Sequence, residues 1–571
     1  MTRALSPEHR DHALASLAAT SAEQPLDVLV VGGGIVGAGA ALDAVTRGLT
    51  VGLVEQRDLA SGTSSRSSKL VHGGLRYLEM FDFGLVKEAL EERGLLLTRL
   101  APHLVRPVPF LYPLHKAWER PYVGAGIALY DVMAMTGRYE MGVPKHKHVF
   151  RKQLARMAPD IRTEDLHGAI RYYDCQVDDA RLVMTLARTA ASHGAQVATR
   201  TKVTGFLTNG GRVVGAQVRD LEAGVDLEVH ARAVVNAAGV WTDQLQELLG
   251  HELALDVDAS KGIHLVVPRD RIRSECGFIT KTEKSVLFVI PWGSHWIIGT
   301  TDTPWDLDLA HPAASRRDID YLLQHVNRLL RVPLDHDDVE GCYAGLRPLL
   351  KPVRRSEDEG TTKLSREHTV ASPMPGLVLI AGGKLTTYRV MAQDAIDAAA
   401  ANLEDVAVSH TDRVLLDGAM GFEVRTNQRV ALSRDSGLDL ASIDHLLGRY
   451  GGLIDELLAL VAERPELGEP LPGTDEYLAA EIVYAVTHEG ARHLDDVLAR
   501  RTRISIETFD RGITSARPAA ELMAPLLGWS EAQTADEVDH YLRRVEAERQ
   551  SQEMPTDQEA DEARVRAPDI V

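Results

Sequence analysis

Apolar and polar residues form distinct patterns along the chain. Residues 26 to 56 hold two apolar runs, LDVLVV and LTVGLVE, on either side of the segment GGGIVGAGAALDAVTRG. Short apolar runs around a glycine turn and a helix-length segment predict a strand, a helix and a second strand. The order of strand, glycine turn and helix returns at residues 376–400, in GLVLIAGGKLTTYRVMAQDAIDAAA. Both stretches are typical of an α/β domain.

The patterns change between and after these stretches. Short β-like runs occupy residues 195–238, and HLVVP, VLFVIPW and WIIGTTDT predict the strands of a second sheet layer. From about residue 405 the spacing becomes helical, as in DLASIDHLLGRYGGLIDELLALVAE. This change predicts a domain boundary near residue 400.

We therefore predict an α/β fold with a Rossmann-like dinucleotide-binding domain, a β-rich substrate-binding subdomain and an all-helical C-terminal domain. The expected divisions are a polar N-terminal tail at 1–24, helical or loose, an interleaved α/β domain at 25–400 and a helical domain at 401–545. Residues 546–571 contain eight acidic and three basic residues, so we expect a disordered tail.

Composition narrows the function. The net charge of -19 argues against a general nucleic-acid binder, because neutralising phosphates needs a basic surface. Cys175, Cys276 and Cys342 are far apart and odd in number, which suggests neither a disulfide framework nor a metal site. The N-terminus has no secretory pattern and no apolar run long enough to span a bilayer, so we expect a cytoplasmic protein.

The first glycine turn carries the clearest chemical signal. Gly32, Gly34 and Gly37 form G-x-G-x-x-G between a predicted strand and helix, and Glu55 ends the next strand. The glycines permit close backbone approach to a pyrophosphate, the helix N-terminus attracts it, and the carboxylate accepts hydrogen bonds from ribose hydroxyls. The motif serves nicotinamide and flavin dinucleotides alike, and a plain packing turn is the alternative.

A second unusual stretch is SSRSSKLVHGGLRYLE, at residues 64–79, which suits neither an amphipathic helix nor an alternating strand. By itself it reads equally well as a serine-rich surface loop or as a binding segment.

Together with GGGIVGAG, this stretch and KGIHLVVP, PWGSHWIIGTTDT, GLRPL, SREHTV and GGKLTTYR resemble the FAD-dependent glycerol-3-phosphate dehydrogenase family over about residues 25–545. The resemblance implies oxidation of sn-glycerol 3-phosphate to dihydroxyacetone phosphate, with FAD as cofactor. It also implies a membrane quinone as electron acceptor and peripheral attachment at the cytoplasmic face of the membrane. An oxidase of the same family, which makes hydrogen peroxide from oxygen, is the alternative, and a homo-oligomer stays open.

The resemblance also assigns residues to the cofactor. Backbone or hydroxyl contacts are expected from the two glycine turns, from the serine-rich segment and from the middle strands. These residues are Gly32, Gly34, Gly37, Glu55, Ser64, Ser65, Ser67, Ser68, Lys69, Val203, Ala237, Gly239, Gly383, Lys384, Leu385 and Thr386.

The substrate side follows from the same resemblance. His264 is the candidate base, because histidine has a suitable pKa, although a histidine at the start of an apolar strand is often structural. Arg347 and Arg366 are candidate phosphate ligands, and Lys384 serves substrate or flavin. Arg76 and Tyr77 are expected at the substrate face. An amine oxidase or a flavin-binding scaffold without activity remain weaker alternatives.

Overall fold

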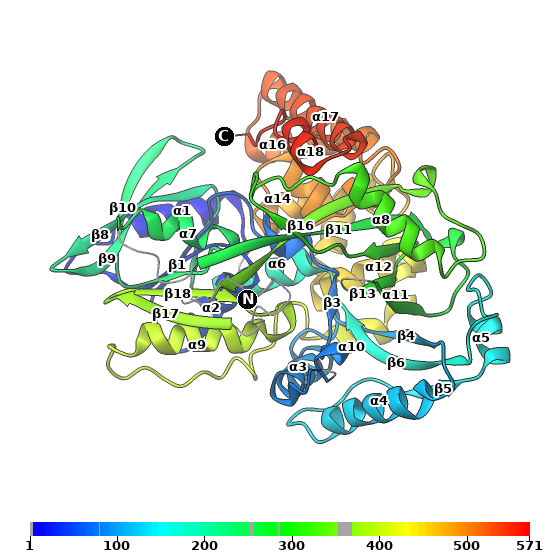
Figure 1. Cartoon of the computed structure of the whole chain (residues 1–571). Helices are drawn as coiled ribbons and strands as arrows, with labels where there is room; N and C mark the ends of the chain where they lie inside the picture. Colours follow the sequence, from blue (N-terminus) through cyan, green and yellow to red (C-terminus); the bar gives the residue numbers. More distant parts are fainter. Residues whose placement is uncertain (1–3, 79, 251–255, 283–285, 352–367, 571) are drawn as a thin grey trace.

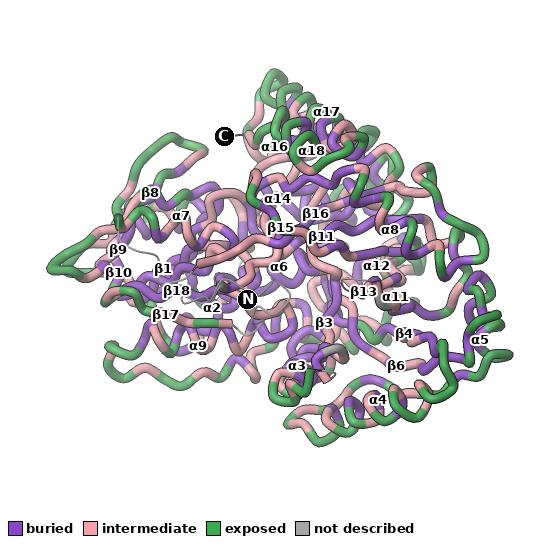
Figure 2. The backbone as a smooth tube through the Cα atoms, in the orientation of Figure 1, coloured by how far each residue is buried: buried purple, intermediate pink, exposed green. Residues whose placement is uncertain are grey.

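The computed structural model describes residues 4–78, 80–250, 256–282, 286–351 and 368–570. Figure 1 shows two sheets side by side, with the C-terminal helices packed along both. Figure 2 shows that the strands near the centre are buried and that exposed residues gather at the outer hairpins and helices.

The first sheet is built around parallel strands in the order β18-β10-β1-β2-β7, with β17 antiparallel at one edge and a β8–β9 hairpin extending from β10. Parallel order requires crossover segments, which the glycine turns and helices provide. The strands are β1 (Leu26–Val31), β2 (Val51–Val54), β7 (Gln196–Ala198), β8 (Thr201–Asn209), β9 (Arg212–Asp220), β10 (Val225–Asn236), β17 (His368–Met374) and β18 (Leu377–Gly382).

Both faces of this sheet are covered. Val28 and Val30 of β1 pack in one apolar cluster with α2 (Ile35–Thr46), α6 (Asp179–Ser192) and α9 (Tyr388–Ala400). Leu29 and Val31 point to the opposite face and pack with the β8–β9 hairpin and with Leu17. Because both faces are buried, the strand reads as a continuous apolar run instead of an alternating one.

The second sheet forms the β-rich subdomain. Its order is β15-β11-β14-β13-β12-β4-β6-β3, and β16 and β5 pair with β11 and β6. Helix α8 (Arg316–Asn327) covers one face, on which Ile263 and Leu265 of β11 lie. The strands are β3 (Leu70–Val71), β4 (Arg106–Leu114), β5 (Lys147–Val149), β6 (Gly168–Gln176), β11 (Asp256–Pro268), β12 (Gly277–Lys281), β13 (Val286–Trp292), β14 (His295–Gly299), β15 (Thr303–Trp305) and β16 (Gly341–Lys351).

Helices α3 (Phe83–Leu95), α4 (Glu119–Met135), α5 (Arg151–Met157) and α7 (Thr242–Glu247) lie around the sheets. The C-terminal region forms its own apolar clusters from amphipathic helices. These helices are α10 (Phe422–Asn427), α11 (Arg429–Ser436), α12 (Leu440–Tyr450), α13 (Ile454–Glu463), α14 (Ala479–Glu489), α15 (Ile504–Glu507), α16 (Ile513–Leu527), α17 (Glu531–Glu553) and α18 (Asp557–Arg564). The predicted fold class, α/β with an all-helical C-terminal region, is confirmed.

The predictions for the two ends of the chain need correction. In the N-terminal tail, the helical alternative holds and the loose one does not, because α1 (Pro7–Ala18) buries Leu17 completely. At the other end, the predicted disorder of residues 546–571 is wrong: α17 continues to Glu553 and α18 follows it. Ion pairs hold this acidic segment in place, since Asp557 lies 2.7 Å from the buried Lys261 ammonium.

Candidate active site

A cavity of about 510 Å³ opens at the carboxyl ends of the parallel strands β1, β10 and β18. Ligands of open α/β sheets bind at this position. Residues predicted for the cofactor that line the cavity are Gly32, Gly34, Glu55, Ser64, Ser67, Val203, Ala237, Gly239, Gly383, Lys384 and Leu385. Gly37, Ser65, Ser68, Lys69 and Thr386 lie outside its lining.

The first glycine turn is shaped by backbone crowding. Gly32 has a φ of +110°, and a Cβ there would lie 2.7 Å from the Ala237 carbonyl oxygen. A Cβ on Gly37 would lie 1.8 Å from the Gly32 carbonyl oxygen, so Gly37 permits the helix to pack on the turn without facing the cavity. Gly34 is the N-cap of α2 and contributes no side-chain hydrogen bond, which leaves the start of the helix accessible to an anion.

Glu55 lines the cavity and also supports the turn. Its carboxylate accepts hydrogen bonds from the backbone N–H of Gly33 at 2.6 Å and of Arg57 at 2.8 Å. Burial raises the pKa of Glu55, and these two hydrogen bonds act against the rise. The predicted contact with a ribose stays a prediction.

The second glycine turn lies at the opposite end of the cavity. Lys384 precedes the short helical turn at 385–387, and its Nζ lies 3.7 Å from the centre of the Tyr77 ring. The Thr386 hydroxyl accepts a hydrogen bond from the His72 N–H at 3.0 Å. These contacts bring residues 72–77 against the second turn, although more than 300 positions separate them in sequence.

The serine-rich stretch divides into residues that face different parts of the molecule. Ser64 accepts a hydrogen bond from Ile35 N–H at 3.0 Å, in the first turn of α2, and Ser67 also lines the cavity. Ser65 lines a second cavity. Ser68 hydrogen-bonds to His264, with 2.8 Å between Oγ and Nε2.

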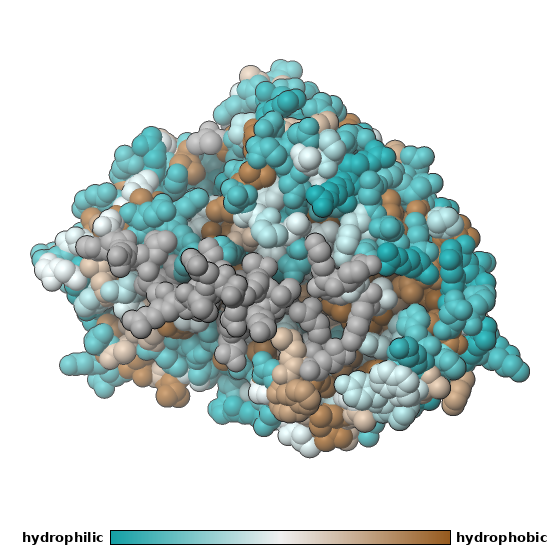
Figure 3. All heavy atoms as spheres, in the orientation of Figure 1, coloured by the Kyte–Doolittle hydropathy of each residue, from teal (hydrophilic) through white to brown (hydrophobic). Residues whose placement is uncertain are grey.

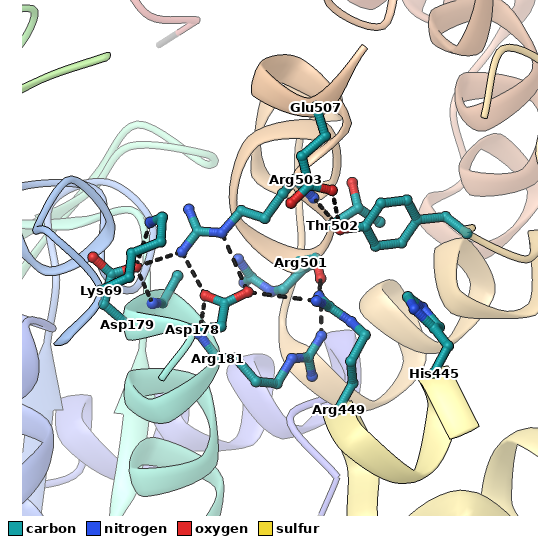
Figure 4. A network of polar contacts seen from close by, with 12 residues as sticks. Lys69, Asp178, Asp179, Arg181, His445, Arg449, Arg501, Thr502, Arg503 and Glu507 are labelled. Atoms are coloured by element: carbon teal, nitrogen blue, oxygen red, sulfur yellow. Dashed lines mark hydrogen bonds and ion pairs between the residues drawn. The ribbon is translucent and has the colours of Figure 1, made fainter. Parts of the chain in front are cut away.

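Lys69 does not place its side chain against the cofactor cavity as expected. It is completely buried, and its ammonium lies 2.8 Å from a carboxylate oxygen of Asp179. Figure 4 shows Lys69, Asp179, Asp178 and Arg503 in one polar network, where Arg503 approaches Asp178 and Asp179 at 2.5 and 2.6 Å. Lys69 therefore ties the serine-rich stretch to the C-terminal domain.

His264 and Arg347 project from the same face of two paired strands. In the β11–β16 pairing, His264 is opposite Tyr343 and Ser260 is opposite Arg347. Three pairs lie between them, and the one that faces the same side consists of two glycines, Gly262 and Gly345. Opposed residues of antiparallel strands point to the same side, so the glycines leave backbone without side chains between the histidine and the arginine.

The surroundings of His264 fix its ring. It stacks on Tyr343 with 4.8 Å between ring centres, and the Tyr343 hydroxyl donates to the Ser67 carbonyl at 3.0 Å. Burial lowers the pKa of His264 well below its usual value, and the charges of Arg347 and Lys69 act in the same direction. A neutral imidazole is the form that can accept a proton. Within the described residues, Nδ1 has no hydrogen-bond partner.

Arg347 lies over Gly262, where a Cβ would come within 2.4 Å of the guanidinium. The guanidinium donates to Thr300 Oγ1 at 3.0 Å and to the Thr301 carbonyl at 3.2 Å, and Asp302 lies 3.4 Å away. The side chain is 28% exposed, so part of it faces solvent.

Two arginines predicted at the substrate site cannot be placed. Arg366 lies outside the described residues, and the side chain of Arg76 is likewise not described. Conversely, sequence reasoning missed Tyr343 and Thr300, which contact His264 and Arg347. The strand register brings Tyr343 to His264, which no local motif signals, whereas Thr300 lies within the quoted stretch PWGSHWIIGTTDT and could have been named there.

Comparison with known proteins identifies the family. The family model described as FAD dependent oxidoreductase matches residues 27–389, and the C-terminal domain of alpha-glycerophosphate oxidase matches residues 409–534. Glycerol-3-phosphate dehydrogenase 2 of Mycobacterium tuberculosis is 56% identical over 96% of this chain and 92% of its own length. The chain belongs to the FAD-dependent glycerol-3-phosphate dehydrogenase family. The predicted resemblance is thereby confirmed.

Two solved structures extend the comparison. The glycerol-3-phosphate dehydrogenase of Bacillus halodurans, solved with FAD, has a TM-score of 0.77 and 31% identity, and the match covers 95% of this chain and 98% of that one. The L-alpha-glycerophosphate oxidase of Mycoplasma pneumoniae shares the fold alone, with a TM-score of 0.52 and 18% identity over 66% and 94% of the two chains.

The cavity fits the family's cofactor. Its lining includes the helix N-terminus at Gly34 and the second turn at Gly383, and a Cβ at Gly34 would lie 3.2 Å from the Ser64 hydroxyl. Glu55 and the backbone at Val203 lie at the end suited to a ribose and a base. FAD as cofactor agrees with the prediction. Among the residues that the structure describes, no cluster could hold a metal ion.

Proposed function

We propose that the protein oxidises sn-glycerol 3-phosphate to dihydroxyacetone phosphate and delivers the electrons to a membrane quinone. One observation carries the substrate assignment: a buried histidine and an arginine project from one sheet face across two glycines, and the histidine contacts Ser68, next to Ser67 of the cavity lining. A secondary alcohol needs a proton acceptor, and its phosphate needs a cation. The names of the relatives agree with this assignment.

The chain's residues take separate roles in this proposal. His264 accepts the proton of the substrate hydroxyl on a ring nitrogen, while Ser68 and Tyr343 hold the ring in place. Arg347 binds the phosphate, and Arg366 and Arg76 complete the cation set. Lys384 and Tyr77 occupy the side of the second glycine turn. Bound FAD supplies the acceptor for the two electrons.

Anaerobic bleaching of the flavin tests the proposal. Glycerol 3-phosphate should bleach the holoenzyme, whereas glycerol, lacking the phosphate, should be a poor substrate. In Arg347→Ala, bleaching efficiency should fall about 100-fold with FAD retained, because a charge-assisted bidentate contact is worth ~1.5–3 kcal/mol per hydrogen bond. In His264→Ala the rate should fall ~100- to 10,000-fold. Equal losses with glycerol and glycerol 3-phosphate in Arg347→Ala would remove the phosphate role.

The quinone part of the proposal needs a membrane-facing surface. The outer side of α4 exposes Trp118, Tyr122, Val132 and Met135, while Tyr130 on its inner side is buried. Met80, Phe81 and Phe83 are exposed beside the start of α3, and Phe81 is 78% exposed. Figure 3 shows hydrophobic atoms gathered at the lower edge of the molecule, where Figure 1 places α3 and α4. We call these seven residues the apolar edge.

Exposed aromatic residues on one side of a helix suit insertion into a membrane interface. No helix in the described ranges is both long and apolar enough to cross a bilayer. We therefore propose peripheral attachment through the apolar edge. Phe81→Ser with Tyr122→Ser should reduce co-sedimentation with phospholipid vesicles, whereas Val225→Ser, at the exposed start of β10, should not. Equal co-sedimentation of both variants would exclude this surface.

Oxygen as the acceptor is the alternative. The comparison of peroxide yield with quinone reduction, measured on the same holoenzyme with vesicles present, separates the two. Rapid peroxide formation without quinone reduction would replace the quinone by oxygen and leave the substrate assignment intact.

A further inference from the structure

A second cavity, of about 120 Å³, lies apart from the flavin cavity. Its wall joins three parts of the chain: the serine-rich stretch at Ser65 and Arg66, the C-terminal domain at Asp495 and Arg544, and the final segment at Arg564. Segments that are hundreds of residues apart in sequence therefore share one enclosed polar space.

The wall has an excess of positive charge. Seven arginines line the cavity against four carboxylates. Asp495 already pairs with Arg500 at 2.8 Å and with Arg544 at 2.5 Å, and Asp569 pairs with Arg57 at 2.7 Å. Local ion pairs thus occupy these two carboxylates. Three further arginines of the wall pair with carboxylates outside the lining, Arg200 with Asp496, Arg500 with Asp58 and Arg503 with Asp178. The weakly compensated arginines of the wall are therefore Arg66 and Arg564.

Arg66 has no carboxylate within ion-pair distance in the described part of the chain. The only hydrogen bond of its side chain there goes to the Ala310 carbonyl, at 3.0 Å from Nη1. Burial lowers the pKa of Arg66 to about 10, and the charges of Arg564 and Arg500 act in the same direction. A guanidinium carries five N–H donors, so most of its capacity is left for another acceptor.

Arg564 is nearly as poorly compensated. It is buried, donates to the Ala567 carbonyl at 3.2 Å and to His311 Nδ1 at 3.2 Å, and lies 3.5 Å from the Glu548 carboxylate. Glu548 stands at the same distance from Arg544. Burial lowers the pKa of Arg564 although Glu548 opposes the shift. A half-buried guanidinium, Arg66, and a buried one, Arg564, therefore face the cavity, with the Glu548 carboxylate 3.5 Å from the second.

We propose that this cavity binds a small phosphate-bearing anion between Arg66 and Arg564. Enclosed charges are costly unless they are paired, and a planar guanidinium matches the geometry of phosphate oxygens. The cavity has the volume of about four water molecules, which suits inorganic phosphate or a small phosphomonoester and excludes a nucleotide.

The site has a physical connection to the catalytic face. Tyr343 lines this cavity and stacks on His264, and the Arg66 carbonyl would lie 2.4 Å from a Cβ on Gly345. An anion between Arg66 and Arg564 would also hold the final segment against the serine-rich stretch. The site therefore regulates stability and the docking of residues 554–570, and it stands whether or not the proposed substrate is correct.

Titration of the FAD-loaded full chain with inorganic phosphate, against chloride at equal ionic strength, tests the proposal. Calorimetry and the thermal unfolding midpoint report binding. Arg66→Gln and Arg564→Gln should each weaken the phosphate affinity at least about tenfold, because one charge-assisted hydrogen bond is worth ~1.5 kcal/mol or more. Arg66→Lys should retain part of it. The matched control, Arg429→Gln, removes a half-exposed arginine of α11 and should change nothing.

Phosphate can also enter the proposed substrate site, so Arg347→Ala serves as the separating variant. Binding that persists in Arg347→Ala and is lost in Arg66→Gln belongs to the second cavity. Loss in Arg347→Ala alone, no binding by the parent chain, or equal affinity in Arg66→Gln would overturn the proposal. If Arg564→Gln fails to fold, the phosphate affinities of Arg66→Gln and Arg66→Lys decide the outcome. Parallel titration with ethyl phosphate distinguishes a phosphomonoester from inorganic phosphate as the occupant.

Discussion

The cavity lined by the two glycine turns and the interface between the α/β and helical domains differ in composition: glycines shape the first, and buried ion pairs form the second. The glycine turns at Gly32 and Gly383 shape the cavity by omitting side chains. At the interface, Asp58 is 1% exposed and accepts hydrogen bonds from Arg500 at 2.5 Å and from Arg501 at 2.6 and 2.7 Å. A cofactor contributes its own polar groups and needs room, whereas a domain contact must compensate every charge that it buries.

The largest expected effect tests whether glycine at the first turn makes room for the cofactor. Gly34→Val should remove FAD, because a branched side chain at the start of α2 occupies the space for the pyrophosphate. The nearest atom to a Cβ there is the Ser64 hydroxyl at 3.2 Å, so we expect the chain to fold. Flavin absorbance per folded chain measures the result, with Gly126→Val, where a Cβ meets nothing within 4 Å, as control. Stoichiometric flavin in folded Gly34→Val would contradict the assignment.

A second prediction tests the contribution of the buried ion pairs at the domain interface. Asp58→Asn leaves the buried Arg501 without its carboxylate and removes one of the three carboxylates paired with Arg500, so it should lower the free energy of unfolding by about 3–5 kcal/mol. Denaturant unfolding of the holoenzyme measures the change. Asp444→Asn is the matched control, because its pair with Arg429 is half-exposed at 3.9 Å and should contribute at most ~1 kcal/mol. Similar losses in the two variants would show that burial does not distinguish these ion pairs.

A smaller effect is the pH dependence of stability that His493 contributes at the domain interface. Burial alone would lower the pKa of His493, but hydrogen bonds with Glu222 at 3.0 Å and Glu537 at 2.7 Å raise it to about 9. The folded value exceeds the unfolded value of about 6.5, so this stabilisation is complete below about pH 6.5 and is lost as the pH rises to about 9.

The expected difference in the free energy of unfolding is about 2–3 kcal/mol between these pH values. Unfolding of the parent chain and of His493→Gln over pH 6–9.5 measures it. The variant should show a flatter dependence, and parallel curves for the two proteins would exclude His493 as the titrating group.

Local motifs predicted the strand, glycine turn and helix at residues 26–46. The spacing of Gly32, Gly34 and Gly37 between a strand and a helix identified the turn, because those geometric demands are met within one continuous segment. The roles of Ser65 and Lys69 could not be predicted from the same kind of pattern. Their contacts depend on Asp179 and on the second cavity, which lie far away in sequence.

The acidic C-terminal segment shows why composition predicted disorder wrongly. Residues 546–571 are rich in acidic residues and have few large apolar side chains, which is typical of disorder. Yet Asp557 and Asp569 meet Lys261, Arg57 and His311, cations contributed by other parts of the chain. The composition of a segment does not show whether cations elsewhere in the chain will pair with its carboxylates.

The sequence by itself determined the α/β fold class, the helical C-terminal region and the position of the dinucleotide turn, because strand and helix periodicity and glycine spacing are local properties. Only the tertiary structure decided that His264 and Arg347 share one sheet face. That arrangement depends on the register of β11 against β16, which places Gly262 opposite Gly345. It also decided where the surplus arginines lie, since Arg66 and Arg564 meet only when three distant segments pack around one cavity. A pairing across 498 positions leaves no periodic signal along the chain.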